Sequence, residues 1–358
     1  VSGGYNLIDA GDEGILTEPT DIDNTPVSWR SFGFHLGKTP TLPPVEGSDV
    51  IDAIPSPSPF SGPPTKDQRG FNRPIGPNFD IGAIEAFPVQ TIGTDPSNLQ
   101  DAIDNAGGEV RIKFSAPSSG QTITLPASTE LIMDNGTVIL DASHLAEAVT
   151  ITGSDTRLLR ILGVQAQLRK LVFLNGNSIQ SLTGNPGDGG AISIGEDSEE
   201  FVSVIDCQFA SNRATSGGSI AVAGGTCALE VRRCSFLTSS ASEGGALYSE
   251  GANVLIVNST FRSNSASGIT GDAIHSTGQM SLTHSTIARN FDTGTNTQGS
   301  VYATGSLYFT HCLWQDNSNS ALTATTPHNG GYNLSDDSPV LFGPDDIINT
   351  DVSLGALD

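Results

Sequence analysis

Two groups of ionisable residues have types and spacings that could support acid–base chemistry. Asp272 and His275 lie three residues apart, and a carboxylate near an imidazole can exchange protons with a substrate. The second group would meet only if successive repeats of the chain stack, and it consists of Asp206, Arg232, Arg233 and Arg262. Enzymes that cleave polysaccharides need two carboxylates about 5–10 Å apart, or acidic calcium ligands beside a basic residue.

Neither group meets that requirement in the sequence. Asp272 replaces a glycine of a repeat at a predicted turn, and no second carboxylate occupies its position in the neighbouring repeats. We expect Arg232 and Arg262 to face solvent from a strand. No catalytic residue is therefore predicted, and a polysaccharide lyase or hydrolase is the alternative interpretation of the chain.

Three acidic segments could bind calcium through oxygen atoms: Asp9-Ala10-Gly11-Asp12-Glu13-Gly14, Asp336-Asp337 and Asp345-Asp346. None has the ligand spacing of a known calcium loop, and we interpret them as solvated acidic turns. No metal site and no cofactor is predicted.

Three of the four cysteines share one position of the repeat. Cys207 and Cys234 lie in successive copies, so that their Cα atoms would come within disulfide range, whereas Cys312 lies three copies beyond Cys234. Two interpretations stay open for Cys207 and Cys234, which are a disulfide bond and two small side chains stacked in a core. No Cys/His cluster predicts zinc.

The repeat that must position these residues begins at Gly189. Its copies start 28, 27, 27 and 28 residues apart, which is typical of a solenoid. The copies are Gly189-Gly190-Ala191-Ile192, Gly217-Gly218-Ser219-Ile220, Gly244-Gly245-Ala246-Leu247, Gly271-Asp272-Ala273-Ile274 and Gly299-Ser300-Val301-Tyr302.

A second register runs in step with the first. Large apolar residues recur at Phe209, Phe236, Phe261, Ile287 and Trp314. Three residues after each comes a small polar residue, in the order Asn212, Ser239, Asn264, Asn290 and Asn317. Between the registers lie short β-type runs such as 253–257, bounded by Gly, Ser and Asn.

These features predict an all-β protein, a parallel β-helix with coils of about 25–28 residues, in which each strand pairs with its counterpart about 4.8 Å away. The apolar column should form a stacked ladder inside the coils. The asparagine column should lie at a tight bend, because asparagine tolerates left-handed dihedrals and its amide can bond its neighbours.

The chain divides into three segments. Residues 1–90 are rich in proline and irregular, residues 91–327 form the predicted β-helix with a short capping helix near 97–106, and residues 328–358 echo residues 1–31. The echo consists of Gly3-Gly4-Tyr5-Asn6-Leu7 with Gly330-Gly331-Tyr332-Asn333-Leu334, and of Asp21-Ile22-Asp23-Asn24-Thr25 with Asp346-Ile347-Ile348-Asn349-Thr350. A longer spacing before Gly189, around Gly184-Asn185-Pro186-Gly187-Asp188, predicts a protruding loop that could make contacts.

Several motifs of the first segment resemble one known family. Thr39-Pro40-Thr41-Leu42, Ile51-Asp52-Ala53, Asp67-Gln68-Arg69-Gly70, Arg73-Pro74 and Asp80-Ile81-Gly82-Ala83-Ile84-Glu85 are similar to the closing segment of bacterial choice-of-anchor Q surface proteins. Those proteins are related in architecture to polymorphic outer-membrane proteins, and the resemblance implies a right-handed, single-stranded parallel β-helix. It implies no catalytic motif, and here the closing segment precedes the β-helix instead of following it.

Charge and composition limit the partners. The chain has 16 Lys and Arg against 39 Asp and Glu, a net charge of −23, which argues against nucleic acid and anionic membranes. No run of 18 apolar residues predicts membrane insertion. We therefore expect a secreted or cell-surface structural and adhesive protein that associates with itself head to tail, as separate subunits or tandem units, to form a filament or stalk. Surface polysaccharide is the other expected partner.

Overall fold

The computed structural model describes residues 4–348 apart from 9–14, 17, 24, 31, 33–34, 38, 60–63, 106–107, 180–187, 196–200, 225–226, 295–298, 318–321 and 336–344. The chain forms two compact units, which are described separately. The first comprises Val1–Val89 with Glu109–Arg111, and the second comprises Gln90–Gly108 with Ile112–Asp358. In the described part of the chain, no helix has the length and apolar character needed to cross a membrane.

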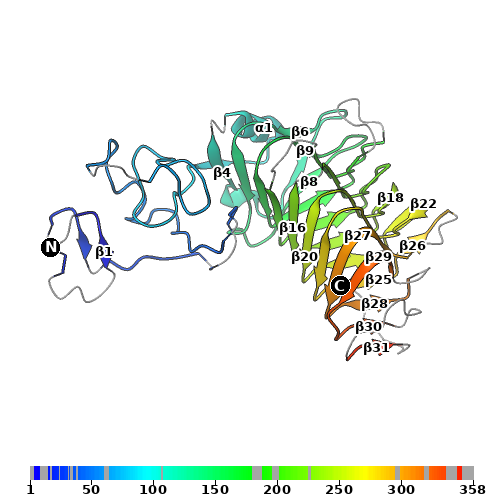
Figure 1. Ribbon diagram of the computed structural model, residues 1–358. Helices are drawn as coiled ribbons and strands as arrows, with labels where there is room; N and C mark the ends of the chain where they lie inside the picture. The colour runs from blue at the N-terminus through cyan, green and yellow to red at the C-terminus, as the bar shows by residue number, and fades with distance from the viewer. Residues whose placement is uncertain are drawn as a thin grey trace. The chain divides into compact units, whose positions relative to one another are not determined.

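The second unit is a parallel β-helix, which confirms the predicted fold class. Strands from successive coils stack side by side and pair in parallel (Figure 1), and they form three faces, here called A, B and C. Face A contains β6 (Leu131–Met133), β9 (Leu159–Ile161), β12 (Ile192–Ile194), β15 (Ile220–Ala223), β19 (Leu247–Glu250) and β23 (Ile274–Ser276). Face B contains β3 (Val89–Ile92), β4 (Glu109–Phe114), β7 (Thr137–Asp141), β10 (Ala166–Arg169), β13 (Phe201–Ile205), β16 (Ala228–Arg232), β20 (Asn253–Val257) and β24 (Met280–Thr283).

Two long strands join faces A and B at the last coils. The first half of β27 (Val301–Thr310) pairs with β23 and the second half pairs with β24, and β29 (Leu322–Asn329) pairs along β27. Face C contains β5 (Thr122–Thr124), β8 (Val149–Thr152), β11 (Leu171–Leu174), β14 (Gln208–Ala210), β17 (Ser235–Leu237), β21 (Thr260–Arg262), β25 (Thr286–Ala288), β28 (Leu313–Gln315), β30 (Leu334–Ser335) and β31 (Ile347–Ile348). A small additional sheet follows face C and contains β18 (Ser240–Glu243), β22 (Ser265–Thr270) and β26 (Phe291–Asp292).

The Gly-Gly pair of the repeat has two separate causes. The first glycine adopts a left-handed conformation, with φ of 61° at Gly217 and 57° at Gly244, where a side chain would be strained. The second glycine leaves room for backbone, because a Cβ atom at Gly218 would collide with the carbonyl oxygen of Gly245 on the next coil. The repeated phrase therefore marks the tight entry into face A.

The predicted apolar ladder runs along the inside of face C and is confirmed. The rings of Phe173, Phe209, Phe236 and Phe261 stack with centroid separations of 5.1, 4.7 and 4.5 Å and interplanar angles of 10° or less. All four side chains are fully buried, and Ile287 and Trp314 extend the column. Parallel stacking at strand spacing thus forms the core of the solenoid.

The asparagine column forms a buried amide ladder. Asn264 Nδ2 donates to the carbonyl oxygen of Phe236 and to Asn290 Oδ1, both at 3.0 Å, while Asn264 Oδ1 accepts from the amide of Ser239. The prediction was right about amide bonding but wrong about the dihedral. The left-handed residue is the one before each amide, for example Ser263 with φ of 56°, because the asparagine must turn inward.

Replacing one rung of this ladder should destabilise the β-helix. Asn264→Ala removes three hydrogen bonds at a fully buried position, and we expect a loss of about 1–3 kcal/mol in the free energy of unfolding. The control is Asn253→Ala, an exposed position at the start of β20. Urea denaturation of both variants checks this, and equal midpoints would contradict the ladder's contribution.

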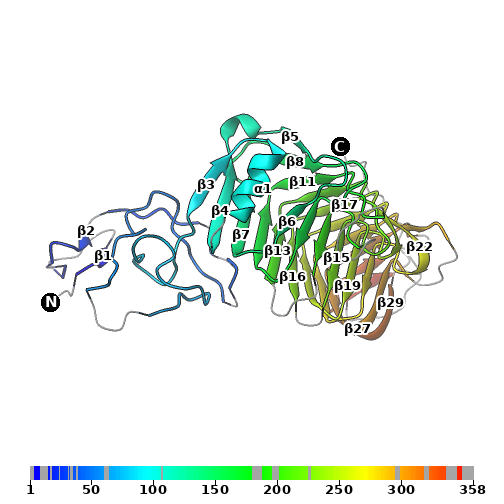
Figure 2. The same ribbon diagram turned by 90° about the horizontal axis from the view of Figure 1, so that it is seen from above.

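The helix α1 (Pro96–Asp104) covers the first coil of face A (Figure 2). Asp95 caps it by accepting from the amide of Ser97. Its buried face is formed by Leu99, Ala102 and Ile103. Gln100 bonds both the amide and the carbonyl oxygen of Ile132, at 2.9 and 3.1 Å, as a neighbouring strand would. The helix therefore closes the edge of β6 against further pairing. The single 3-10 turn is η1 (Ala116–Ser118) among the described residues.

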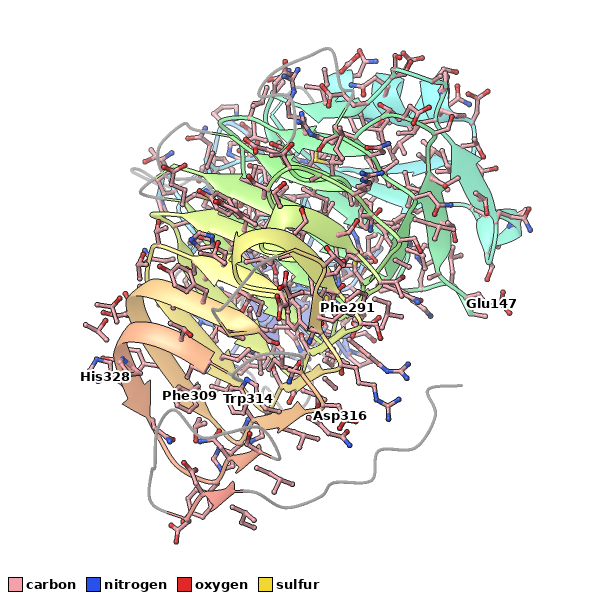
Figure 3. The ribbon with its side chains drawn as sticks, turned by 90° about the vertical axis from the view of Figure 1, so that its right-hand side faces the viewer. Glu147, Phe291, Phe309, Trp314, Asp316 and His328 are labelled. Carbon is pink, nitrogen blue, oxygen red and sulfur yellow. The ribbon has the colours of Figure 1, made fainter. Side chains whose placement is uncertain are left out.

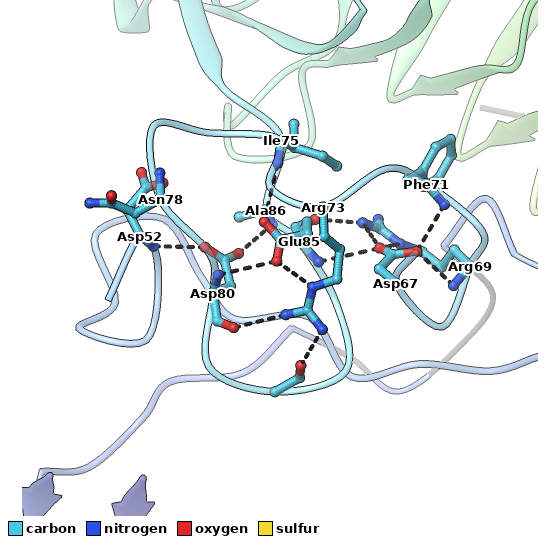
Figure 4. Close-up of polar contacts among 11 residues, drawn as sticks. Asp52, Asp67, Arg69, Phe71, Arg73, Ile75, Asn78, Asp80, Glu85 and Ala86 are labelled. Carbon is cyan, nitrogen blue, oxygen red and sulfur yellow. Dashed lines mark hydrogen bonds and ion pairs between the residues drawn. The ribbon is translucent and has the colours of Figure 1, made fainter. Parts of the chain in front are cut away.

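The first unit contains little regular structure. Its strands β1 (Leu7–Ile8) and β2 (Ile22–Asp23) pair in parallel. Elsewhere a buried network of charged residues organises the chain, as Figure 4 shows. Asp67 accepts from Arg69 Nε at 2.8 Å, and Arg73 Nε donates to Glu85 at 2.6 Å.

This network is formed by residues of the motifs 67–70, 73–74 and 80–85 of the first segment. Asp80 accepts from the amides of Asp52 and Ala86, and Glu85 accepts from the amide of Asp80. Burial raises the pKa of the Asp80 carboxyl to about 6, although those two amide bonds oppose the shift. In the described chain these motifs therefore have a structural role.

Candidate binding surface

The structure buries both members of the first predicted pair. Asp272 is fully buried at the position that Gly245 occupies one coil earlier. His275 lies on β23 and is 7% exposed, with Nδ1 placed 2.9 Å from Thr270 Oγ1 and 3.7 Å from Glu243 Oε2.

His275 is the centre of an aromatic column on the outer side of face A. Tyr248 and Tyr302 pack on it edge to face from the adjacent coils, each with a centroid separation of 5.0 Å. Burial lowers the pKa of His275 to about 4, so that the imidazole is neutral at pH 7. The contact with Glu243 is therefore not an ion pair at that pH, and the ring is a poor general base.

The second predicted group takes part in two ion pairs, of which one joins adjacent coils. Asp206 accepts from Arg233 Nε and Nη2 at 2.6 and 3.0 Å across adjacent coils, whereas Arg232 pairs with Glu230. The Asp206–Arg233 pair is exposed, and the hydrogen bond with Asp206 is the main cause that raises the pKa of Arg233. Arg262 is half-buried on β21. The bidentate pair with Arg233 occupies both carboxylate oxygens of Asp206 and joins adjacent coils.

The cysteines of the shared register are stacked thiols in this structure. Cys207, Cys234 and Cys312 are buried, and their Sγ atoms donate to backbone carbonyl oxygens. Cys234 Sγ also accepts from the amide of Cys207 at 3.4 Å. Burial raises the pKa of the Cys312 thiol to about 11 and also raises that of Cys207, so these thiols are poor nucleophiles.

Of the three acidic segments considered for calcium binding, the structure describes only Asp345-Asp346. The segments 9–14 and 336–337 lie outside the described residues, as does the predicted loop 184–187. Asp346 instead accepts from Asn329 Nδ2 at 2.6 Å and from the amide of Asn333 at 2.8 Å. Within the described ranges, no group of three His, Cys, Asp or Glu residues could hold a metal ion.

One exposed column was not anticipated from the sequence. From β10 onward, a single left-handed residue turns the chain from face B to face C in successive coils, with φ between 49° and 58°. The residues at this turn are Lys170, Asp206, Arg233, Asn258, His284, His311 and Tyr332. From Asp206 onward they are all exposed, so their side chains form a row along one edge of the β-helix.

The last coils turn this row into an aromatic surface. His284 and His311 stack with centroids 4.5 Å apart, and His311 stacks on Tyr332 at 5.3 Å. A second stack lies on the outer side of face B, where Tyr308 and His328 are 4.5 Å apart. We call these five residues the aromatic edge.

The aromatic edge faces solvent. Tyr308 is 46% exposed and Tyr332 is 60% exposed. Figure 3 shows His328 at the outside of the last coils, whereas Phe309 and Trp314 lie within them and are buried.

Stacked rings present their polar edges outward. Phenol hydroxyls and imidazole nitrogens lie at ring edges, and stacking repeats them at the strand spacing of about 4.8 Å. Thr310 Oγ1 donates to the carbonyl oxygen of Gly331 and lies 2.9 Å from His311 Nδ1, which orients that imidazole. The edge can therefore bond a row of hydroxyl groups on an extended ligand while its ring bodies cover apolar surface.

No protein-family model matches the chain, and no curated protein matches it in sequence. The fold and the geometry of its surfaces define the class, which is that of parallel β-helix proteins.

Proposed function

We propose that this protein is a non-catalytic extracellular β-helix protein with a structural and adhesive role, and that its aromatic edge binds neutral polysaccharide. The observation that carries the proposal is the aromatic edge itself, with one stack of three exposed rings and a second stack of two, each repeated from coil to coil. Tyrosine combines an apolar body with a polar tip and is enriched at binding surfaces. A rigid solenoid presents such a row as a straight track.

Charge selects between the classes of polysaccharide. The net charge of −23 repels acidic polymers over a Debye length, so that a neutral chain of hydroxyl-bearing sugars is the favoured ligand. The same charge disfavours nucleic acid and anionic membranes. The cell surface as location and the resemblance to choice-of-anchor Q proteins are part of this proposal.

A non-catalytic role is supported by the state of the ionisable groups. His275 is neutral and buried, Asp272 is fully buried, and Asp206 is engaged by Arg233. Acid–base catalysis works best with groups whose pKa lies near the operating pH and that reach the substrate. The protein should therefore bind polysaccharide without shortening it.

Affinity electrophoresis in gels that contain a soluble neutral glucan or galactomannan tests this function. We expect retardation that weakens about fivefold or more in Tyr308→Thr and in Tyr332→Asn, because central aromatic residues dominate binding energy. Thr suits a strand, and Asn tolerates the left-handed turn of Tyr332, so each variant removes a ring with little backbone strain.

Phe291→Ala is the matched control, since Phe291 is 41% exposed on β26 and is not part of the aromatic edge. Its retardation should equal that of the parent chain. Stronger retardation by pectate or alginate than by neutral polymers would contradict the proposal. Depolymerisation of the neutral chain by the purified protein would contradict the non-catalytic role.

A further inference from the structure

The sequence echo between the two ends of the chain corresponds to one structural motif that occurs twice. In the first unit, β1 pairs with β2 so that Leu7 lies opposite Ile22 and Ile8 lies opposite Asp23. In the β-helix, β30 pairs with β31 so that Leu334 lies opposite Ile347 and Ser335 lies opposite Ile348. The echoed residues therefore pair in the same register in both copies.

The same side-chain hydrogen bonds close both copies. Asn6 donates from its amide and from Nδ2 to Asp21 Oδ1, both at 3.0 Å. Asn333 donates from its amide and from Nδ2 to Asp346 Oδ1, at 2.8 and 3.1 Å. The backbone bonds also match. Ile22 begins β2 and donates its amide to the carbonyl oxygen of Asn6, and Ile347 begins β31 and donates its amide to the carbonyl oxygen of Asn333.

The backbone that leads into the motif is also the same. Gly4 and Gly331 have φ of 89° and 82°, and Tyr5 and Tyr332 have φ of 56° and 58°. Asn6 Nδ2 and Asn333 Nδ2 each donate to the carbonyl oxygen of the glycine two residues earlier. Two segments more than 300 residues apart thus share sequence, dihedrals, register and bonding.

The two copies differ in what covers them. In the β-helix, β30 lies between β28 and β31 in the ten-stranded sheet. Asn333 is 6% exposed there because Cys312 of the preceding coil donates its amide to Asn333 Oδ1 and accepts from the amide of Leu334, both at 2.9 Å. The β1–β2 pair forms a sheet of only two strands within the described residues, and Asn6 is exposed.

We propose that the β1–β2 pair of one molecule binds the β28 edge of a second copy of this chain, in place of that copy's own β30–β31 pair. The β30–β31 pair already binds the β28 edge within the chain. Because the β1–β2 pair has the same sequence, register and hydrogen bonds, the β28 edge of a second molecule is the surface that fits it. Within one chain, Leu334 lies opposite Leu313. If the incoming pair keeps the same register, Leu7 of one molecule lies opposite Leu313 of the other. Main-chain hydrogen bonds supply affinity in such strand addition.

The exchange makes the contact head to tail. The β1–β2 pair of one molecule binds near residue 313 of the next molecule, so the two surfaces in contact are different. Such a heterologous interface adds further molecules into a fibre unless the rotation between them closes a ring. This inference deepens the structural part of the proposed function and rests on it, but it does not depend on polysaccharide binding. The chain's own β30–β31 pair competes for the same edge with the advantage of being intramolecular.

Engineered cysteines test the register directly in the full chain. Leu7 and Leu313 are both half-buried, and residues opposite each other on neighbouring strands lie within disulfide range. We expect L7C/L313C to form disulfide-linked dimers and higher multimers after mild oxidation, read on non-reducing gels and by mass spectrometry. The control L7C/L255C, with its second site half-buried on β20, should stay monomeric.

The other disulfide outcomes overturn the proposal. A bond within one L7C/L313C molecule would show that the partner is the same chain. Multimers of L7C/I347C without multimers of L7C/L313C would show addition beyond β31 instead of exchange at β28.

Competition between the two copies of the motif gives a second test without cross-linking. N333A/D346A weakens the resident pair and should raise the association constant measured by sedimentation about tenfold, because the lost hydrogen bonds no longer oppose exchange. N6A/D21A removes the same bonds from the incoming pair and should abolish association.

Equal effects of the two double variants on association, or no association at any concentration, would overturn the exchange. Retardation by neutral glucan should be unchanged in N6A/D21A, which separates a failure of this inference from a failure of polysaccharide binding.

Discussion

Phe236→Ala is expected to lower the free energy of unfolding of the β-helix by about 3–5 kcal/mol. Phe236 is fully buried, and its ring lies 4.7 Å from that of Phe209 and 4.5 Å from that of Phe261. Truncation removes the transfer free energy of a whole ring and leaves a cavity. The rigid hydrogen-bonded coils on either side cannot move together to fill it, because each strand is fixed at the strand spacing.

The two tryptophans allow this loss to be assigned to the β-helix. Trp314 lies in the apolar column, whereas Trp29 lies in the first unit and is 47% exposed. In a Trp29→Phe background, the fluorescence of Trp314 therefore reports the unfolding of the β-helix. Guanidinium titration of Phe236→Ala in that background measures the change.

Phe291→Ala is again the matched control, because it removes the same side chain from an exposed position on β26. Its effect should stay within about 0.5 kcal/mol. If both variants shifted the midpoint equally, the stacked ladder would not be a principal source of stability.

The β-helix could be predicted because its interior repeats. Phe209, Phe236 and Phe261 each face the same environment one coil apart, so the same side chain satisfies it every time. The glycines of the repeat follow from a fixed backbone path, in which a left-handed turn and a close approach recur. Because these steric requirements recur in every coil, the same residue types recur at a fixed spacing in the sequence.

The aromatic edge left no such trace. Three of its residues, His284, His311 and Tyr332, occupy a turn that requires a positive φ but faces solvent, and Asp206, Arg233 and Asn258 meet the same demand. No neighbouring residue restricts which side chain can occupy this turn. The residues of the column therefore show no common type in the sequence, and the column is recognised only in the structure. The additional sheet of β18, β22 and β26 was missed for a similar reason, since its strands have no apolar alternation.

The internal contacts of the first unit were not predicted from the sequence, because a network of buried charged residues joins its irregular chain. Hydrophobic periodicity identifies elements that bury apolar faces, whereas Asp67, Arg69, Arg73, Asp80 and Glu85 are joined by hydrogen bonds in an irregular chain. The motifs that contain these residues were visible in the sequence, but their spacing did not predict which residues would be in contact. Their partners could be assigned only from the structure.

The second large effect is expected from this network, where Asp67→Asn should destabilise the first unit by about 3–5 kcal/mol. Asp67 has a fully buried side chain, and it accepts from Arg69 Nε and Nη2 at 2.8 and 2.6 Å. It also accepts from the amides of Arg69, Phe71 and Glu85. Asparagine keeps the shape but removes the charge and one acceptor oxygen.

Arg69 cannot relieve the loss by moving to water. Its side chain is 5% exposed, and the guanidinium lies 4.9 Å from the ring centroid of Phe71 and 4.8 Å from that of Phe87. Burial already lowers the pKa of Arg69, and Asp67 is the main opposing influence. Without that carboxylate the buried cation has weak compensation, which is the costly case for a broken ion pair.

Asp206→Asn provides the comparison that separates buried from exposed charge. Asp206 and Arg233 form a bidentate pair of similar geometry, but their side chains are 37% and 53% exposed. Asparagine also tolerates the left-handed conformation of Asp206, so the expected cost is only about 0–1 kcal/mol. Unfolding of Asp67→Asn is followed by the fluorescence of Trp29 in a Trp314→Phe background, which reports on the first unit. Unfolding of Asp206→Asn is followed by the fluorescence of Trp314 in the Trp29→Phe background, which reports on the β-helix. Comparable losses for the two variants would mean that desolvation of Arg69 contributes nothing beyond the pair geometry, and the buried network would then not be what holds the first unit together.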